Sequence, residues 1–336
     1  MRKIGIIGAG SWGTALAVNL ARNNHVVTIW SIMEDEIKML EEHREHLDKL
    51  PGIKLDETMQ FTTDLETAIK GMDMLVLAVP SIFTRSTSKA MAPFVEEGQI
   101  IACVAKGIED DTFMTITDIV EDEIPQADVC VLCGPSHAEE VGLGLPTTVV
   151  AGAKTRQSAE FIQDTFMNET FRVYTSPDML GMELGGSLKN VIALAAGMCD
   201  GLGYGDNTKA ALIVRGISEV TRLAYAMGAK TETINGLTGI GDLIVTCQSK
   251  HSRNRKAGEL MGQGMTMEEA TKEVKMVVEG VYSAKAALAL GKKFYVTMPI
   301  IEEVNKVLFE NKSARNAVND LMLREKRAES NSLDWR

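Results

Sequence analysis

The chain has 336 residues, of which 45% are apolar and 24% charged, a composition typical of globular proteins and too apolar for extended disorder. Its net charge of −11 has the wrong sign for binding nucleic acid or anionic lipid. No apolar run reaches the roughly 18 residues of a membrane span, and five cysteines without a charged-then-apolar leader favour the reducing cytoplasm.

Strand and helix patterns alternate over the first 175 residues. Short apolar runs predict strands at 3–8, 26–30, 74–79, 100–105, 129–134, 147–152 and 171–175. Helical periodicity lies between them at 12–22, 34–47, 64–70, 82–92 and 112–122. This alternation predicts an α/β fold with a doubly wound, mostly parallel sheet.

The first predicted strand leads into a glycine-rich loop. Gly8, Gly10 and Gly13 form G-x-G-x-x-G before a helix and a second strand, a pattern in which the glycines turn the chain and admit a pyrophosphate. We therefore expect a Rossmann-like sheet that binds NAD(H) or NADP(H). An acid about 20 residues after the loop would bind the ribose 2′-hydroxyl of NAD, and an arginine nearby would bind the 2′-phosphate of NADP. Trp30 and Ser31 lie at this place instead, so the sequence does not choose between these cofactors.

Two domains are expected, because 336 residues exceed one typical hydrophobic core. Residues 1–180 would form the dinucleotide-binding domain. From 181 to 325 the pattern is mostly amphipathic helices broken by glycine clusters, so residues 181–336 would form an all-helical substrate-binding and catalytic domain. Cys130 and Cys133 form C-x-x-C, but a strand points them to opposite faces, and we expect no metal.

Lys189 is unusual in the helix predicted to open the second domain. It lies in ELGGSLKNVIALAAGM, a run made almost entirely of glycine, alanine and aliphatic residues. Burial favours the neutral amine of a lysine. Lys189 is therefore either a group that moves a proton or a structural lysine whose ammonium reaches solvent.

Four other stretches place polar groups near predicted strand or helix ends. Lys106 follows a strand at the edge where parallel sheets bind ligands. Ser136 precedes Glu139 by three residues, which predicts a capping box, and Asp242 follows two closely spaced glycines. Arg253, in S-R-N-R before a helix, suits a phosphate monoester. A solvated lysine, a capped helix and a solvated basic turn are the structural alternatives.

Seven stretches occur along the chain in the order GAGSWGTALA, AKGIE, CGPSHAEE, LGGSLKNVIALAAGM, GLTGIGDLIVTC, SRNRKAG and VVEG. In this order they resemble the bacterial-type NAD(P)-dependent glycerol-3-phosphate dehydrogenase family. The resemblance implies reversible reduction of dihydroxyacetone phosphate, a small phosphorylated three-carbon substrate, to sn-glycerol 3-phosphate by hydride transfer from NAD(P)H. It also implies a role in cytoplasmic glycerophospholipid synthesis.

The resemblance implies roles for individual residues as well. Lys189 would be the catalytic proton donor and acceptor. The residues implied to bind substrate are Lys106, Gly134, Ser136, Lys189, Asp242, Ser252, Arg253 and Asn254. Those implied to bind the dinucleotide are Gly8, Gly10, Ser11, Trp12, Gly13, Lys106, Ala138, Arg253, Val277 and Glu279.

Two other functions fit the same domain pattern. A 3-hydroxyacid or 6-phosphogluconate-type dehydrogenase also joins a dinucleotide domain to a helical one. A non-catalytic dinucleotide sensor would instead use the helical domain as a partner surface. The sequence leaves the oligomeric state open, with a homodimer among the alternatives.

Overall fold

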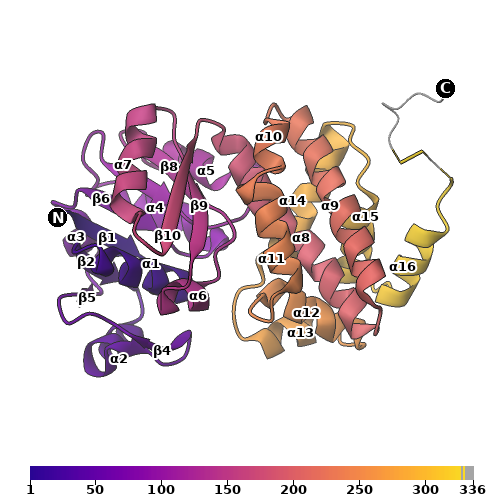
Figure 1. Ribbon diagram of the computed structural model, residues 1–336, viewed down its shortest axis with the longest axis horizontal. Coiled ribbons are helices and arrows are strands. Elements are labelled where there is room, and N and C mark those ends of the chain that lie inside the picture. Colours follow the sequence, from indigo (N-terminus) through magenta and orange to yellow (C-terminus); the bar gives the residue numbers. More distant parts are fainter. Residues whose placement is uncertain (327, 330–336) are drawn as a thin grey trace.

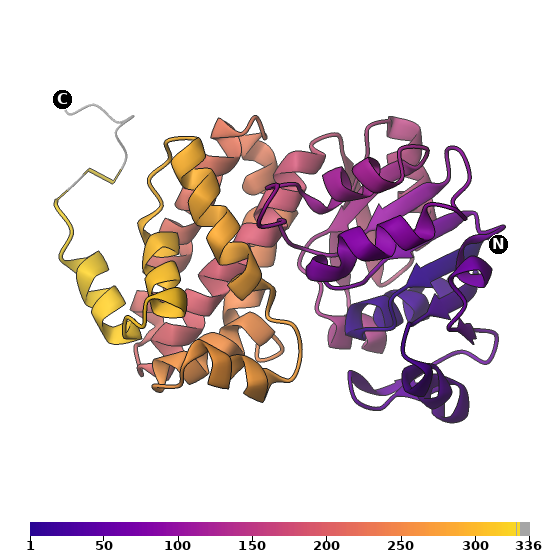
Figure 2. The ribbon, with the colours of Figure 1, turned by 180° about the vertical axis from the view of Figure 1, so that it is seen from behind.

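The computed structural model describes residues 1–326, 328 and 329. Figure 1 shows two parts side by side along the longest axis, a sheet covered by helices and a bundle of helices. The view from behind in Figure 2 shows the same division. The chain begins in the sheet part, and the last helix lies on the far side of the bundle.

The sheet contains eight strands in the order β10-β9-β8-β7-β6-β1-β2-β5. All neighbours are parallel except β8 and β9, which pair antiparallel with Leu132 opposite Ala151. The predicted mostly parallel sheet is therefore confirmed. Its strands are β1 (Lys3–Ile7), β2 (Val26–Trp30), β5 (Gln60–Thr62), β6 (Met74–Leu77), β7 (Ile100–Cys103), β8 (Asp128–Cys133), β9 (Thr147–Gly152) and β10 (Phe171–Ser176).

Helices cover both faces of this sheet, because successive strand residues point to opposite sides. Leu16 of α1 and Ile162 of α7 belong to the apolar cluster on one face. Met91 of α4 and Ile119 of α5 belong to the cluster on the other face. The helices of this part are α1 (Ser11–Arg22), α2 (Glu34–His43), α3 (Leu65–Ile69), α4 (Thr84–Met91), α5 (Ile116–Glu123), α6 (Ala138–Leu143) and α7 (Arg156–Phe166), with a 3₁₀ turn at Ser81–Phe83.

The predicted helix at 34–47 is wrong at its end. Helix α2 stops at His43 because Arg44 adopts a left-handed conformation with φ of 47°. The chain then forms a small hairpin of β3 (Glu45–His46) and β4 (Leu50–Lys54). This hairpin and the edge strand β5 were not predicted.

The second part of the described chain is helical. Its helices are α8 (Met179–Gly201), α9 (Asp206–Ala226), α10 (Thr231–Ile234), α11 (Asp242–Gln248), α12 (Arg253–Gly262), α13 (Met267–Val274), α14 (Glu279–Lys293), α15 (Pro299–Phe309) and α16 (Ala314–Met322), and a π-helical turn covers Leu237–Gly241. Within the described ranges no helix is both long and apolar enough to cross a bilayer.

Helix α8 is the central helix of the molecule and is buried from Gly181 to Cys199. Its glycines allow neighbouring helices to approach closely. A Cβ on Gly197 would collide with the backbone of α12, and a Cβ on Gly258 of α12 would collide with the backbone of α8. At its other end, the Glu183 carboxylate accepts hydrogen bonds from Thr117 at the start of α5. Helix α8 therefore contacts both parts.

Candidate active site

Two lysines and one aspartate form a buried group that we call the lysine–aspartate cluster. Lys189 Nζ lies 2.7 Å from Asp242 Oδ1, and Lys106 Nζ lies 2.7 Å from Asp242 Oδ2. Lys189 is 6% exposed and Asp242 1%. Both lysines therefore face inward, and the alternative in which Lys189 extends into solvent is wrong.

Four elements bring this cluster together. Lys189 lies midway along α8, and Asp242 is the first residue of α11. Lys106 follows β7 and donates to the carbonyl of Gly134, which follows the neighbouring strand β8, at 3.1 Å. Since β7 and β8 are parallel, both loops lie at the carboxyl edge of the sheet, where such folds bind ligands.

Thr246 completes the surroundings of Lys189, although the sequence analysis did not single it out. Its hydroxyl accepts from Lys189 Nζ at 2.5 Å and donates to the Asp242 carbonyl at 2.6 Å. Asp242 and Thr246 are four residues apart on a helix and so share a face. That spacing was the available signal in the sequence.

Burial and charge shift the proton affinities of the cluster. Burial, aided by repulsion from Lys106, lowers the pKa of Lys189 to about 8, against the attraction of Asp242. Burial alone would raise the pKa of Asp242, but the two ammonium groups outweigh it and lower that pKa. The pKa of Lys106 is raised, because Asp242 more than offsets the effect of burial. Of the two ammonium groups, that of Lys189 therefore gives up its proton more readily than that of Lys106.

The glycine-rich loop fits a dinucleotide. Gly8 has a φ of +117°, and a Cβ there would press against the backbone of Ala78 and Val79. The position above Gly10 is open, because a Cβ added there would meet no atom within 4 Å. Gly13 packs directly against the Gly8 carbonyl. The loop therefore leaves room for a pyrophosphate at the start of α1, where backbone amides favour an anion.

A second polar group lies at the carboxyl end of β2, beside this loop. The buried Glu36 carboxylate accepts from Ser31, His46 and Lys49. Burial would raise the pKa of Glu36, but these donors lower it to about 2. Ser11 Oγ also donates to the Lys49 carbonyl at 2.7 Å. Lys49 and His46 were missed in the sequence because they belong to the unpredicted hairpin.

The S-R-N-R stretch separates into different roles. Ser252 caps α12 by accepting from the Arg255 amide. The side chain of Arg253 is exposed, with Glu139 and Glu279 as its charged neighbours. Arg255 Nε instead lies 2.6 Å from Asp200 Oδ2, so this guanidinium is already paired with a protein carboxylate.

Asn254 is buried and already engaged by protein groups. Its amide donates to Asn190 at 3.0 Å and its oxygen accepts from the Gly280 amide at 2.8 Å. Asn190 is adjacent to Lys189 on α8. Asn254 thus joins α12 to α8 and α14 and holds the helix of Lys189 in place.

The remaining candidates lie around these groups. Ser136 Oγ donates to the Gly134 carbonyl at 3.0 Å and does not cap α6. The capping-box prediction is therefore wrong, because α6 begins at Ala138, later than the pattern implied. Glu279, the first residue of α14, accepts from the Ser81 amide at 3.1 Å, while Trp12 and Val277 are half-buried.

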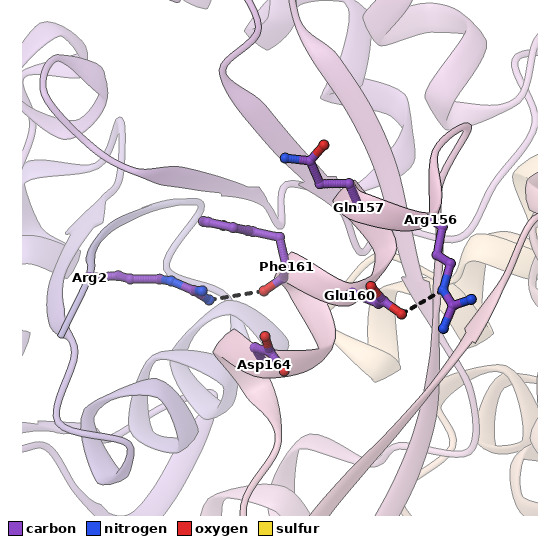
Figure 3. Close-up of a pocket in the computed structure, with 6 residues that line it drawn as sticks. All are labelled: Arg2, Arg156, Gln157, Glu160, Phe161 and Asp164. Carbon is purple, nitrogen blue, oxygen red and sulfur yellow. Dashed lines mark hydrogen bonds and ion pairs between the residues drawn. The ribbon is translucent and has the colours of Figure 1, made fainter.

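Two hollows lie apart from the lysine–aspartate cluster. One, of about 500 Å³, is lined by Arg2, Arg156, Gln157, Glu160, Phe161 and Asp164, and Figure 3 shows Arg156 pairing there with Glu160. The other, of about 1,030 Å³, is formed by α9, α15 and α16 with their flanking residues. Neither contains a residue implied to bind substrate or cofactor. Among the described residues no group of three or more His, Cys, Asp and Glu side chains could hold a metal ion.

Comparison with known proteins identifies the family. A family model described as the NAD-dependent glycerol-3-phosphate dehydrogenase N-terminus matches residues 3–159, and the corresponding C-terminus model matches residues 178–319. The chain belongs to this family. Its dinucleotide cofactor and its place among the oxidoreductases agree with the sequence analysis.

Full-length relatives of this family are close in sequence and structure. Glycerol-3-phosphate dehydrogenase (NAD(P)+) of Agathobacter rectalis is 72% identical over 336 residues, covering 100% of both chains. The protein of that name in Fusobacterium nucleatum is 57% identical over 99% of this chain and 100% of its own. The crystal structure of glycerol-3-phosphate dehydrogenase from Coxiella burnetii is 36% identical and matches with a TM-score of 0.93, covering 96% of this chain and 99% of that one.

Proposed function

We propose that this chain catalyses the reversible reduction of dihydroxyacetone phosphate to sn-glycerol 3-phosphate, with NADH or NADPH as the reductant. The observation that carries the proposal is the buried Lys189 ammonium, held by Asp242 and Thr246 beside the carboxyl edge of the sheet. Family membership supports the same reaction.

Lys189 is the proton donor in this proposal. Reduction of a ketone produces an alkoxide, which must be stabilised and protonated. Bound reduced nicotinamide supplies the hydride. The Lys189 ammonium donates a hydrogen bond to the carbonyl oxygen, then transfers its proton to the alkoxide and becomes a neutral amine. In the oxidative direction the amine takes the proton from the alcohol, and a pKa of about 8 keeps both forms accessible.

Asp242 and Lys106 support this proton transfer. The Asp242 carboxylate orients the Lys189 nitrogen through a 2.7 Å contact, and its other oxygen holds Lys106. Because Lys106 keeps its proton more firmly, it remains a fixed positive charge while Lys189 cycles between its two forms. A fixed charge in a water-poor site stabilises a developing oxyanion without reorganisation.

Arg253 is our assignment for the substrate phosphate. Its exposed guanidinium follows the Ser252 cap at the start of α12. Guanidinium groups bind phosphate oxygens through two parallel hydrogen bonds. The dinucleotide would contact the loop from Gly8 to Gly13, and Ala138, Val277 and Glu279 are our further assignments to its site.

The proposal includes the setting of the enzyme. We place the enzyme in the cytoplasm, where it would supply glycerophospholipid precursors. Its five cysteines are all free and buried, which agrees with a reducing compartment. A homodimer is supported by large apolar side chains exposed on α9 and α16, including Val214, Tyr225 and Met322. Sedimentation velocity across a concentration range tests the dimer.

The deciding experiment is an absorbance assay of the purified chain with dihydroxyacetone phosphate, run in parallel with NADH and NADPH. Ketone-dependent loss of reduced cofactor, with sn-glycerol 3-phosphate as product, is expected. Cofactor binding without turnover would support a dinucleotide sensor instead. Turnover only with a 3-hydroxyacid or 6-phosphogluconate would show that the chain has the activity of those dehydrogenases instead.

A further inference from the structure

His137 carries a buried ring nitrogen without a hydrogen-bond partner. Its Nε2 contacts neither solvent nor any polar atom within bonding distance in the described part of the chain. Native proteins pair nearly all buried polar atoms, so each exception needs an explanation. His137 precedes α6 in the chain, but its side chain makes no capping bond to that helix. Capping therefore does not account for this nitrogen.

The position of His137 connects it to the candidate active site. It lies in the loop after β8, three residues beyond Gly134, whose carbonyl holds Lys106. The ring centroid of His137 is also 6.0 Å from that of His251. His251 comes two residues before Arg253 in the chain. His137 is thus close to His251 and close enough to the lysine–aspartate cluster for both of its ammonium groups to act on the imidazole.

The charges around His137 favour a neutral imidazole. Burial lowers its pKa, and repulsion from the Lys189 and Lys106 ammonium groups lowers it further. Glu139 and the Val245 carbonyl act in the opposite direction without reversing the shift. Glu139 Oε1 also lies 3.7 Å from His251 Nδ1. A neutral imidazole has one N–H donor and one nitrogen acceptor, so it can pair with a hydroxyl or with a phosphate oxygen.

We propose that His137 Nε2 hydrogen-bonds an oxygen of the bound phosphorylated substrate and so helps to determine substrate specificity. The inference rests on the proposed function. Apart from its reacting carbonyl, dihydroxyacetone phosphate offers a terminal hydroxyl and a phosphate, and either one gives His137 the partner that it lacks. A ligand without these oxygens would leave the nitrogen unpaired. Such a ligand should bind more weakly, because an unpaired buried polar group costs free energy.

The test compares His137→Phe, which keeps a planar ring without nitrogen, with His137→Gln, which restores a donor and an acceptor. His251→Phe is the matched control, because it alters the neighbouring ring. KM and kcat are measured for dihydroxyacetone phosphate, for hydroxyacetone phosphate, which lacks the hydroxyl, and for dihydroxyacetone, which lacks the phosphate. Calorimetric titration with sn-glycerol 3-phosphate gives the same comparison without turnover.

We expect His137→Phe to raise KM for dihydroxyacetone phosphate, and Kd for sn-glycerol 3-phosphate, about tenfold with little change in kcat. His137→Gln should recover most of this loss, and His251→Phe should stay within about twofold of the wild type. If His137→Phe leaves KM for hydroxyacetone phosphate at its wild-type value, the partner of His137 is the hydroxyl that this ketone lacks. If the variant leaves KM for dihydroxyacetone at its wild-type value, the partner is the phosphate.

Unchanged constants in His137→Phe, an equal rise for all three ketones, or an equal loss in His251→Phe would overturn the inference. These outcomes are separate from failure of the proposed function. Absence of wild-type turnover would refute that function, while the Kd ratio from calorimetry would still decide the role of His137.

Discussion

The Lys189 ammonium lies 2.7 Å from the Asp242 carboxylate, and both side chains are buried. Because Asp242 also holds Lys106, the fully ionised cluster has two positive charges and one negative charge. The surplus positive charge has two effects. It attracts an anionic substrate, and it makes one of the two ammonium groups easier to deprotonate.

Removal of the Lys189 side chain should abolish most catalysis. We expect Lys189→Ala to lose a factor on the order of 10²–10⁴ in kcat, the usual contribution of a positioned proton donor. Asp242 keeps its second partner, Lys106, so the variant should fold and bind dinucleotide. Steady-state kinetics measures the loss, with Lys154→Ala at an exposed ion pair as control. Near-normal turnover would remove Lys189 from the mechanism.

The pH dependence should follow the proton on Lys189. Its pKa of about 8 means that the ammonium form required for ketone reduction is lost as pH rises through about 8. The value of kcat/KM for reduction should therefore fall above pH 8, whereas that for glycerol 3-phosphate oxidation should rise. Profiles recorded in both directions from pH 6 to 10 check this, and parallel profiles would contradict it.

Arg253 should matter most for the phosphorylated substrate. Arg253→Ala should raise KM for dihydroxyacetone phosphate at least tenfold, because a charge-assisted phosphate contact is lost. KM for free dihydroxyacetone should change little. Arg255→Ala is the matched control, since Arg255 pairs with Asp200 and should affect stability more than KM. Equal effects of Arg253→Ala on both ketones would argue against phosphate recognition.

Lys49 should influence the choice of dinucleotide. Its ammonium, one-third exposed, lies at the carboxyl end of β2 beside Ser31, where the adenosine ribose binds in such folds. We expect Lys49→Met to raise KM for NADPH about tenfold and KM for NADH less than threefold, because only NADPH carries a 2′-phosphate. Lys54→Met, on the same hairpin, is the control. An equal change for both cofactors would show that Lys49 does not read the 2′-phosphate.

Glu219 should make folding stability depend on pH. Its carboxylate accepts from the Ile300 and Ile301 amides at the start of α15, and burial raises its pKa from 4.5 to about 7. The native state then binds more protons than the unfolded state between these values, so stability falls as pH rises from about 4.5 to 7. Glu219→Gln should remove up to about 3 kcal/mol of this decline. Urea unfolding at pH 5 and 8 measures it, with the half-exposed Glu302→Gln as control.

Seven of the eight strands of the sheet could be predicted, because each of these seven is a short apolar run that recurs between helical patterns. The β3–β4 hairpin could not, since Glu45 and His46 continue the helical period of α2 and become a strand only by pairing with Leu50 and Lys54. Edge strand β5 has three residues and one partner strand, which is too little local signal.

The site was predictable to a similar extent. Lys189 is conspicuous because a charged residue interrupts an apolar helix, and Asp242 follows an unusual glycine-rich turn. The partners of Asn254 and Arg255 could not be foreseen, because Asn190 and Asp200 are more than 50 residues away in the chain. Local spacing reports only neighbours three or four residues apart.

Glu183 joins α8 to α5 through the backbone and hydroxyl of Thr117, while the far end of the same helix is packed against α12 through Gly197 and Gly258. Chimeras that exchange halves between relatives at a junction near residue 180 would therefore contain an α8 whose contacts with the rest of the chain come from two different proteins. A viable hybrid would have to exchange α8 together with α5 and α12. Recombination within this fold is therefore constrained more by the contacts of one helix than by the chain segment that precedes it.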